Sequence, residues 1–204
     1  MRASQCLTCT ALSCADVDHG SFVVPGIDID PEAVSIVMVS EAAPGNPGDY
    51  YYAGKGSLFE RTTVEAFRDA GADISSIRDL VDMGVYFTTA VKCGKTGYGI
   101  LADTIGACSL LLERELSLFP NVRVLMLMGD VAIRSLNSIA RREKVGRIIP
   151  AGPTYLVRGG AYEFHGIRVL PSYLQAGPAY FIETSKRRMI AEDIATALRL
   201  VAAA

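Results

Sequence analysis

Four short apolar runs, separated by segments with helical periodicity, limit the fold more than any other feature of this chain. They lie at residues 35–40, 85–91, 122–128 and 167–170. Continuous apolar runs of this length, rich in branched side chains, are typical of strands buried on both faces of a parallel sheet. Strands that alternate with helices predict an α/β fold, a three-layer α/β/α sandwich with a central, mainly parallel four-stranded sheet.

The segments between the runs carry recognisable helix signals. A helix is expected from residue 57 to about 70, because apolar residues recur at helical spacing and Gly71 follows as a stop signal. Further helices are expected near 74–83, 101–118, 130–140 and 184–203. A β-hairpin is expected from strands 155–157 and 162–164 around Gly159 and Gly160, and the strand at 167–170 is expected to stop at Pro171.

Length and composition predict a single domain over residues 1–204. The chain has 204 residues, half of them apolar and 21% charged, with a mean hydropathy of +0.27, which is enough to bury one sizeable core. No window reaches the roughly eighteen apolar residues that a membrane span requires, and cysteines stand where a signal peptide would carry its apolar core. We therefore expect a cytoplasmic monomer that does not contact membranes.

The charge of the chain provides no general case for nucleic-acid binding. Its net charge is -2 and its sequence pI is near 5.7, whereas proteins that bind phosphates usually carry a basic excess or a basic face. Local basic clusters occur at 141–147 and 186–188. Each cluster fits a solvated helix face as well as a phosphate contact.

Four of the five cysteines form two pairs along the chain. Cys6 and Cys9 are separated by two residues, while Cys93 ends an apolar run and Cys108 lies one expected helix later. Residues 1–26 show almost no periodicity, so this segment is expected to be anchored by something other than its own hydrogen bonds, such as a metal. Four thiolates suit zinc and a 4Fe-4S cluster equally, and their spacing does not choose between them. Disulfides are the weaker alternative for an intracellular chain.

Four segments together resemble the uracil-DNA glycosylase superfamily, and within it the iron-sulfur branch called family 4. They are the Cys6-x2-Cys9 motif leading to 24–26, the 43–45 loop, the 88–93 strand end and the 171–174 loop. The resemblance covers nearly the whole chain. It implies hydrolysis of the N-glycosidic bond of uracil or another deaminated base flipped out of DNA, by a DNA repair enzyme.

The resemblance also implies a cofactor and a set of site residues. It implies a 4Fe-4S cluster on Cys6, Cys9, Cys93 and Cys108, with zinc as the alternative and Cys14 as a spare thiol. A reaction of this kind needs a pocket that stacks the base, donors for the leaving base, and a group that positions water. The residues expected to act are Glu41, Asp49 and Ser172 in catalysis, Ala43, Gly45, Tyr52 and Thr89 at the base, and Lys92, Ser172, Tyr173 and Gln175 at the DNA.

Two positions depart from the family pattern, and a third is ambiguous. Thr89 stands where the family carries an asparagine, and one hydroxyl cannot reproduce the paired donor and acceptor of an amide. Leu170 stands where the family carries a histidine. A one-residue shift decides whether Glu41 or Ala42 occupies the family's acidic position. An alternative therefore remains open, in which the protein is a catalytically weak or inactive DNA- or nucleobase-binding protein of the same fold.

Overall fold

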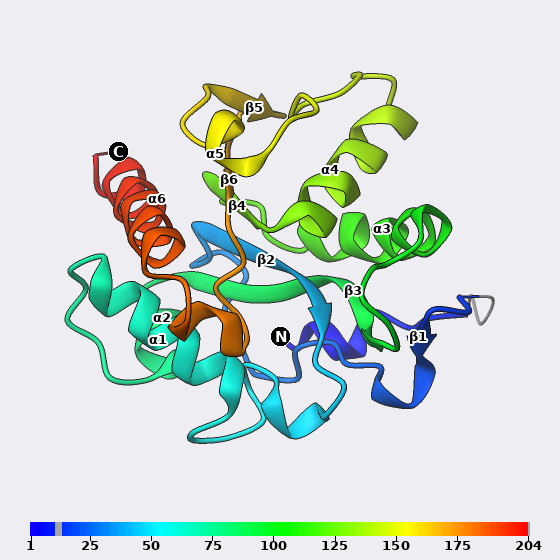
Figure 1. Ribbon diagram of the computed structural model, residues 1–204, viewed down its shortest axis with the longest axis horizontal. Helices are drawn as coiled ribbons and strands as arrows, with labels where there is room; N and C mark the ends of the chain where they lie inside the picture. Colours follow the sequence, from blue (N-terminus) through cyan, green and yellow to red (C-terminus); the bar gives the residue numbers. More distant parts are fainter. Residues whose placement is uncertain (11–13, 204) are drawn as a thin grey trace.

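The computed structural model, which describes residues 1–10 and 14–203, contains a six-stranded sheet between two layers of helices (Figure 1). The strand order is β1-β3-β2-β4-β6-β5. The four central strands, β2, β3, β4 and β6, are parallel, and the two edge strands are antiparallel to their neighbours. The strands are β1 Val17–Asp18, β2 Ile36–Ala43, β3 Val85–Lys95, β4 Val124–Met128, β5 Tyr162–Phe164 and β6 Ile167–Ser172.

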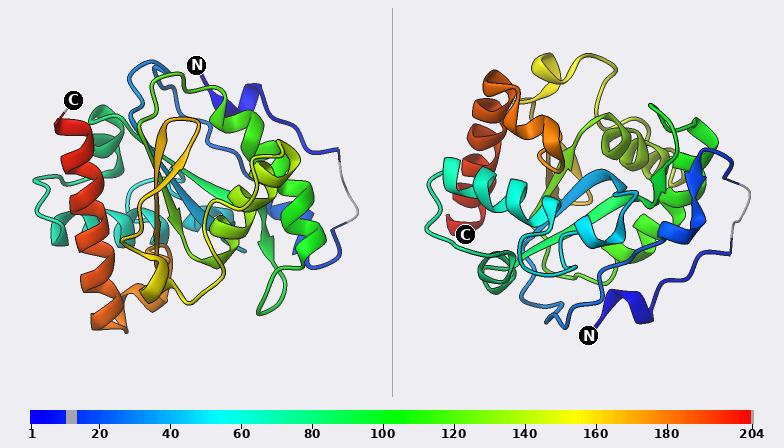
Figure 2. Two further views of the ribbon diagram at one scale, coloured as in Figure 1. Left: turned by 90° about the horizontal axis from the view of Figure 1, so that it is seen from above. Right: turned by 60° about the horizontal axis from the view of Figure 1, so that its bottom comes forward.

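Helices α3 and α4 cover one face of the sheet, and α1 and α6 cover the other (Figures 1 and 2). Alternate residues of β2 explain the two layers, because Val37 and Val39 belong to the core under α3 and α4, while Met38 belongs to the core under α1 and α6. The helices are α1 Leu58–Asp69, α2 Ile77–Asp82, α3 Ala102–Leu116, α4 Asp130–Arg142, α5 Thr154–Val157 and α6 Thr184–Ala202. None of the described helices is long and apolar enough to cross a bilayer.

The predicted α/β sandwich is confirmed, with corrections at the sheet edges. The sheet has six strands rather than four, because two short antiparallel strands extend its parallel centre. The predicted hairpin is wrong, since Thr154–Val157 forms the short helix α5 and β5 instead pairs with β6 across a turn at His165 and Gly166. Both turn residues have positive φ, at 52° and 78°.

Strand β6 also runs past the expected stop at Pro171 and ends at Ser172. Its pairing with β5 ends opposite Val169, so beyond that residue β4 is its one neighbouring strand in the part of the chain that the structure describes. A strand with one free side tolerates a proline, which has no N–H to donate.

All four parallel strands end at the same edge of the sheet. The loops that leave this edge follow Ala43, Lys95, Met128 and Ser172. Open α/β sheets bind ligands outside the carboxyl ends of their strands, where such loops and helix N-termini surround a crevice. This edge is therefore the place where a functional site is expected.

Candidate functional site

A small cavity of about 200 Å³ lies at the carboxyl edge of the sheet. Residues from the ends of three parallel strands meet there, and α6 and the short turn η4 (Pro178–Phe181) complete its wall. Its lining includes Glu41 near the end of β2, Gly129 and Asp130 after β4, Tyr173 and Leu174 after β6, Tyr180 of η4, and Lys186 and Arg187 of α6. We call this cavity the edge cavity.

Glu41 is the half-buried acid of the edge cavity. Its carboxylate lies 3.5 Å from the backbone N–H of Val131, in the first turn of α4. Burial raises the pKa of the Glu41 carboxyl above its ordinary value; the N–H of Val131 and the charge of Lys95 oppose this shift, and the charge of Asp130 adds to it. A carboxyl group whose charged form is disfavoured by burial is suited to accept a proton or to hold a water molecule.

Gly129 allows Glu41 to reach this position. A Cβ at residue 129 would lie 2.5 Å from Oε1 of Glu41, and the φ of Gly129 is +101°, which side chains other than glycine rarely adopt. The backbone of the turn from β4 into α4 therefore approaches the carboxylate closely, and only glycine permits that approach. The match to the family left open whether Glu41 or Ala42 occupies the acidic position. Of these two residues, Glu41 lines the cavity.

Aromatic and basic side chains also line the edge cavity. The Nζ of Lys186 lies 5.4 Å from the centre of the Tyr173 ring, and the guanidinium of Arg187 lies 5.1 Å from the centre of the Tyr180 ring. Arg187 also pairs with Asp69. Part of the basic cluster at 186–188 thus faces a cavity at the functional edge rather than bulk solvent.

Lys92, predicted to contact DNA, is instead buried in the core. Its side chain is fully inaccessible and forms an ion pair with Glu115 of α3, whose side chain is equally buried. The Nζ of Lys92 also donates to Thr88 Oγ1 at 2.7 Å and to the carbonyl of Thr89 at 2.6 Å. The prediction of a phosphate contact is corrected, because a lysine with these partners has no exposed surface to offer to a DNA strand.

Ser172 and Gln175 are likewise interior residues, and the predicted DNA contacts of both are corrected. Ser172 is fully buried and donates to Asp193 Oδ2 at 2.6 Å, so its hydroxyl faces α6. The amide of Gln175 lies 3.2 Å from the hydroxyl of Tyr51 and 3.2 Å from that of Ser40. Of the residues predicted to contact DNA, Tyr173 is the one that lines the edge cavity.

The residues predicted to bind the base are not gathered at the edge cavity. The hydroxyl of Tyr52 accepts the backbone N–H of Phe87 at 2.9 Å, on the side of β3 away from β2, and its ring lines a different and larger cavity. Thr89 is fully buried, and its hydroxyl has no hydrogen-bond partner within the described residues. Neither residue lines the cavity of Glu41.

The loop after β2 is shaped by close backbone contact. Ala43 ends β2 at a shift in the register with β3. The Cα of Gly45 lies so close to Gly94 that a Cβ on Gly94 would stand 2.8 Å from it. Asp49 ends the short turn Pro47–Asp49, which the Asn46 side chain caps by accepting the N–H of Gly48. Asp49 does not line the edge cavity, so its predicted catalytic role finds no support in its position.

Thiols from the N-terminal segment, β3 and α3 lie near one another on the α3 side of the sheet. Cys93 and Cys108 are buried, and burial raises the pKa of the Cys93 thiol to about 12, with the nearby thiols of Cys108, Cys9 and Cys14 adding to the shift. A small cavity of about 110 Å³ is lined by Cys9, Cys14 and Cys108 among other residues. Cys6 is exposed, and its sulfur lies 3.9 Å from the carbonyl oxygen of Arg2.

This arrangement suits an iron-sulfur cluster by ligand type, but the four thiols implied by the family resemblance do not surround one centre. Within residues 1–10 and 14–203, no three histidine, cysteine or acidic side chains are placed to hold a metal ion together. Cys14, the expected spare, is among the thiols that act on Cys93 and that line the small cavity, whereas Cys6 belongs to neither group. His19 is a further neighbour, because its Nε2 lies 3.0 Å from the carbonyl of Cys14 and its Nδ1 lies 4.0 Å from the Cys93 sulfur.

Comparison with known proteins identifies the family. No protein-family profile matches the chain. A type-5 uracil-DNA glycosylase of Thermus thermophilus is 30% identical over 160 residues, which cover 76% of this chain and 72% of that enzyme. The chain belongs to the uracil-DNA glycosylase superfamily. This relative is a type-5 enzyme, so the narrower resemblance to family 4 and the two pocket departures remain predictions.

Some features of the candidate site gave little signal in the sequence of this chain. Lys186 and Arg187 could have been assigned to the site only through the basic cluster that they share with Arg188. Gly129 gave a local signal, since a glycine at the end of a buried strand and before a helix often marks a tight turn. The position of Cys14 beside Cys93 could not be read from spacing.

Proposed function

We propose that the protein is a DNA glycosylase that hydrolyses the N-glycosidic bond of uracil or another deaminated base. Membership of the uracil-DNA glycosylase superfamily supports the reaction class. The observation that carries the proposal is the half-buried Glu41 carboxyl at the edge cavity, with a raised pKa, in a cavity that Tyr173 also lines.

In this proposal the edge cavity receives the base together with its sugar. Glu41 orients a water molecule and accepts its proton as the water oxygen bonds to C1′ and the bond from C1′ to the base nitrogen breaks. The electron pair of that bond leaves with the base, and the positive charge of Lys186, which also lines the cavity, would stabilise the resulting anion. Tyr173 offers a flat ring for stacking.

Single-turnover cleavage tests this proposal. Protein in excess is incubated with oligonucleotides that contain uracil, hypoxanthine or xanthine, and abasic sites are detected by alkali cleavage. We expect Glu41→Gln to lower the rate by about 10²- to 10⁴-fold, the range for loss of a general base. Glu163→Gln, which neutralises an exposed glutamate on β5, is the matched control.

Two results would count against the assignment. A Glu41→Gln rate equal to that of the wild type would remove Glu41 from the mechanism. DNA binding without cleavage of any of the three bases would point to the alternative, a binding protein of the same fold.

We further propose that the clustered thiols hold a 4Fe-4S cluster, with zinc as the alternative metal. Cys9, Cys93 and Cys108 would supply three thiolates, and the fourth would come from Cys6, as the family resemblance implies, or from Cys14. When bound, such a cluster would tie the N-terminal segment to β3 and α3, the elements that carry Cys93 and Cys108. No step of the hydrolysis above depends on it.

Metal analysis of protein purified without oxygen tests the cofactor and its ligands together. A brown protein with about four irons per chain supports the cluster, and a colourless protein with stoichiometric zinc contradicts it. Cys6→Ser and Cys14→Ser are compared for iron content, and the variant that loses iron identifies the fourth ligand.

A further inference from the structure

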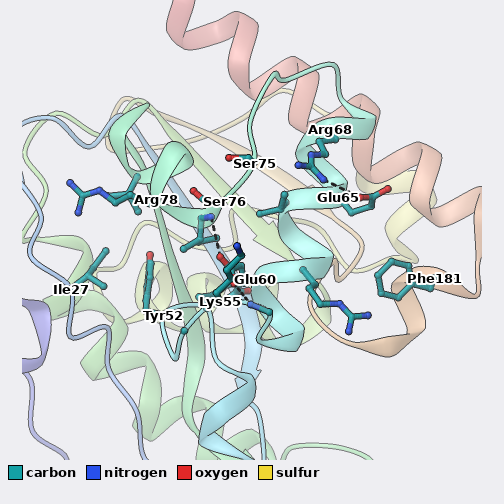
Figure 3. A pocket seen from close by; sticks show the side chains of 17 residues that line it. Ile27, Tyr52, Lys55, Glu60, Glu65, Arg68, Ser75, Ser76, Arg78 and Phe181 are labelled. Atoms are coloured by element: carbon teal, nitrogen blue, oxygen red, sulfur yellow. Dashed lines mark hydrogen bonds and ion pairs between the residues drawn. The ribbon is translucent and has the colours of Figure 1, made fainter.

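The larger cavity that Tyr52 lines has a volume of about 740 Å³. We call it the flank cavity. It is lined by residues 54–56, by α1 and α2, and by Phe181 of η4, and Figure 3 shows Tyr52 and Phe181 on opposite sides of it. Its volume lies within the range of about 300–1,000 Å³ that is typical of ligand-binding sites. It is well over three times as large as the edge cavity.

The flank cavity carries an excess of basic side chains in a protein that is acidic overall. Four basic and two acidic residues line it, whereas the whole chain has a net charge of -2. Lys55 and Arg61 are exposed, and within the described residues no carboxylate pairs with either. The guanidinium of Arg61 instead lies 5.9 Å from the centre of the Phe181 ring.

One of the two acidic side chains of this cavity is already engaged by the backbone. Glu60 accepts the N–H of Gly56 at 2.7 Å and lies 3.5 Å from the N–H of Ile77. Its carboxylate therefore fixes the loop that carries Lys55 to the start of α2. An anion in this cavity would meet the free charges of Lys55 and Arg61, between two aromatic rings.

One turn of 3-10 helix separates the flank cavity from the edge cavity. Tyr180 lines the edge cavity and Phe181 lines the flank cavity, although their rings are only 5.5 Å apart in a T-shaped contact. A base in the edge cavity would thus have the flank cavity immediately beside it. Consecutive nucleotides of one strand could occupy both cavities.

We propose that the flank cavity binds the nucleotide next to the excised base, with its base against the Phe181 ring and its phosphate on Lys55 and Arg61. Aromatic rings interleaved with cations are the means by which proteins bind unpaired nucleotides without reading their sequence. A neighbouring base held in this way is out of the duplex stack, so the substrate class is single-stranded or locally unpaired DNA. This inference rests on the proposed glycosylase function, because that function places a strand at the edge cavity.

Binding to an oligonucleotide without uracil tests the inference separately from catalysis. Fluorescence anisotropy measures the affinity of the intact protein for a labelled single strand and for the matching duplex. Phe181→Ala is expected to weaken single-strand binding about tenfold, through loss of base stacking. Arg61→Gln is expected to lower the slope of log affinity against log salt by about 0.7, the value for one phosphate of a single strand. Arg147→Gln, an exposed arginine outside both cavities, is the charge-matched control.

Three outcomes would overturn the inference. In the first, Phe181→Ala and Arg61→Gln both bind the single strand as tightly as Arg147→Gln. In the second, the wild type binds the duplex more tightly than the single strand. In the third, thymidine monophosphate binds the wild type as tightly as the oligonucleotide does, and Phe181→Ala abolishes this binding. That result would make the cavity a site for free nucleotides. Because the oligonucleotide contains no uracil, a protein that fails to cleave uracil but shows the expected losses would refute only the proposed reaction.

Discussion

The ion pair between Lys92 and Glu115 should dominate the stability of the centre of this fold. Both side chains are fully inaccessible to solvent. The hydroxyl of Tyr86 donates to Glu115 Oε1 at 2.7 Å, and Thr88 Oγ1 lies 2.9 Å from the same oxygen. Every charged atom of the pair therefore has hydrogen-bond partners, and the network ties β3 to α3.

Removal of one partner leaves the other charge buried and unpaired. Lys92→Met should lower the free energy of unfolding by about 3–5 kcal/mol, the typical cost of an uncompensated buried charge. For a chain of this length, a loss of that size lowers Tm by about 6–20 °C. Glu115→Leu should cost a similar amount, because it leaves the ammonium of Lys92 with only Thr88 and the carbonyl of Thr89.

The double variant Lys92→Met/Glu115→Leu separates the charge effect from simple loss of packing. It buries no charge, but the hydroxyls of Tyr86 and Thr88 lose their acceptor, and each loss costs about 1–3 kcal/mol. We therefore expect it to be about as stable as either single variant, and far more stable than the sum of the two losses predicts. Urea unfolding followed by circular dichroism measures all three variants.

An exposed pair provides the control, and two results would refute the reasoning. Arg78 pairs with Asp82 at 2.9 Å on the surface, so Arg78→Met should change the free energy of unfolding by less than about 1 kcal/mol. Strictly additive losses in the double variant would show that the pair does not act as a unit. A Lys92→Met protein of unchanged stability and weakened DNA affinity would restore Lys92 as a phosphate contact.

Further predictions concern the edge cavity and the strand ends around it. Because burial raises the pKa of Glu41, kcat/KM should fall as the pH drops through a midpoint above the ordinary carboxyl value of 4.5. Glu41→Gln should not show this fall at low pH. A midpoint at or below 4.5 in the wild type would contradict the proposed role. Ser172→Ala removes the hydroxyl that donates to Asp193 and should cost about 1.5–3 kcal/mol in urea unfolding, whereas weakened DNA binding at unchanged stability would place Ser172 at the DNA. Gly129→Ala should lower the free energy of unfolding more than Gly71→Ala, since both glycines have positive φ but a Cβ at residue 71 meets nothing within 4 Å. Equal losses would show that the Glu41 side chain moves away from the new Cβ at little cost.

The layers of this protein follow from its sequence because they depend on local patterns. Apolar runs of four to eight residues and helical periodicity are properties of neighbouring residues, and the four parallel strands were predicted from them. The resemblance to the glycosylase motifs left Glu41 and Ala42 as alternatives for the acidic position and assigned both to the loop after the first of these strands, whereas both lie within β2. The short edge strands β1 and β5 were missed as parts of the sheet, because two or three residues carry too little pattern to predict their pairing.

The roles of the polar residues at the strand ends were decided by tertiary structure. Lys92 finds Glu115 across 23 positions of the chain, and Gln175 finds Ser40 across 135. Whether a lysine or a glutamine at a strand end faces DNA or a buried partner depends on what packs against it, and no local pattern records that. The same holds for Cys14, which lies beside Cys93 because of how the N-terminal segment folds back onto β3 and not because of any spacing between cysteines. Local patterns determined where the strands and helices form, and contacts distant in the sequence decided which polar side chains are left free to act.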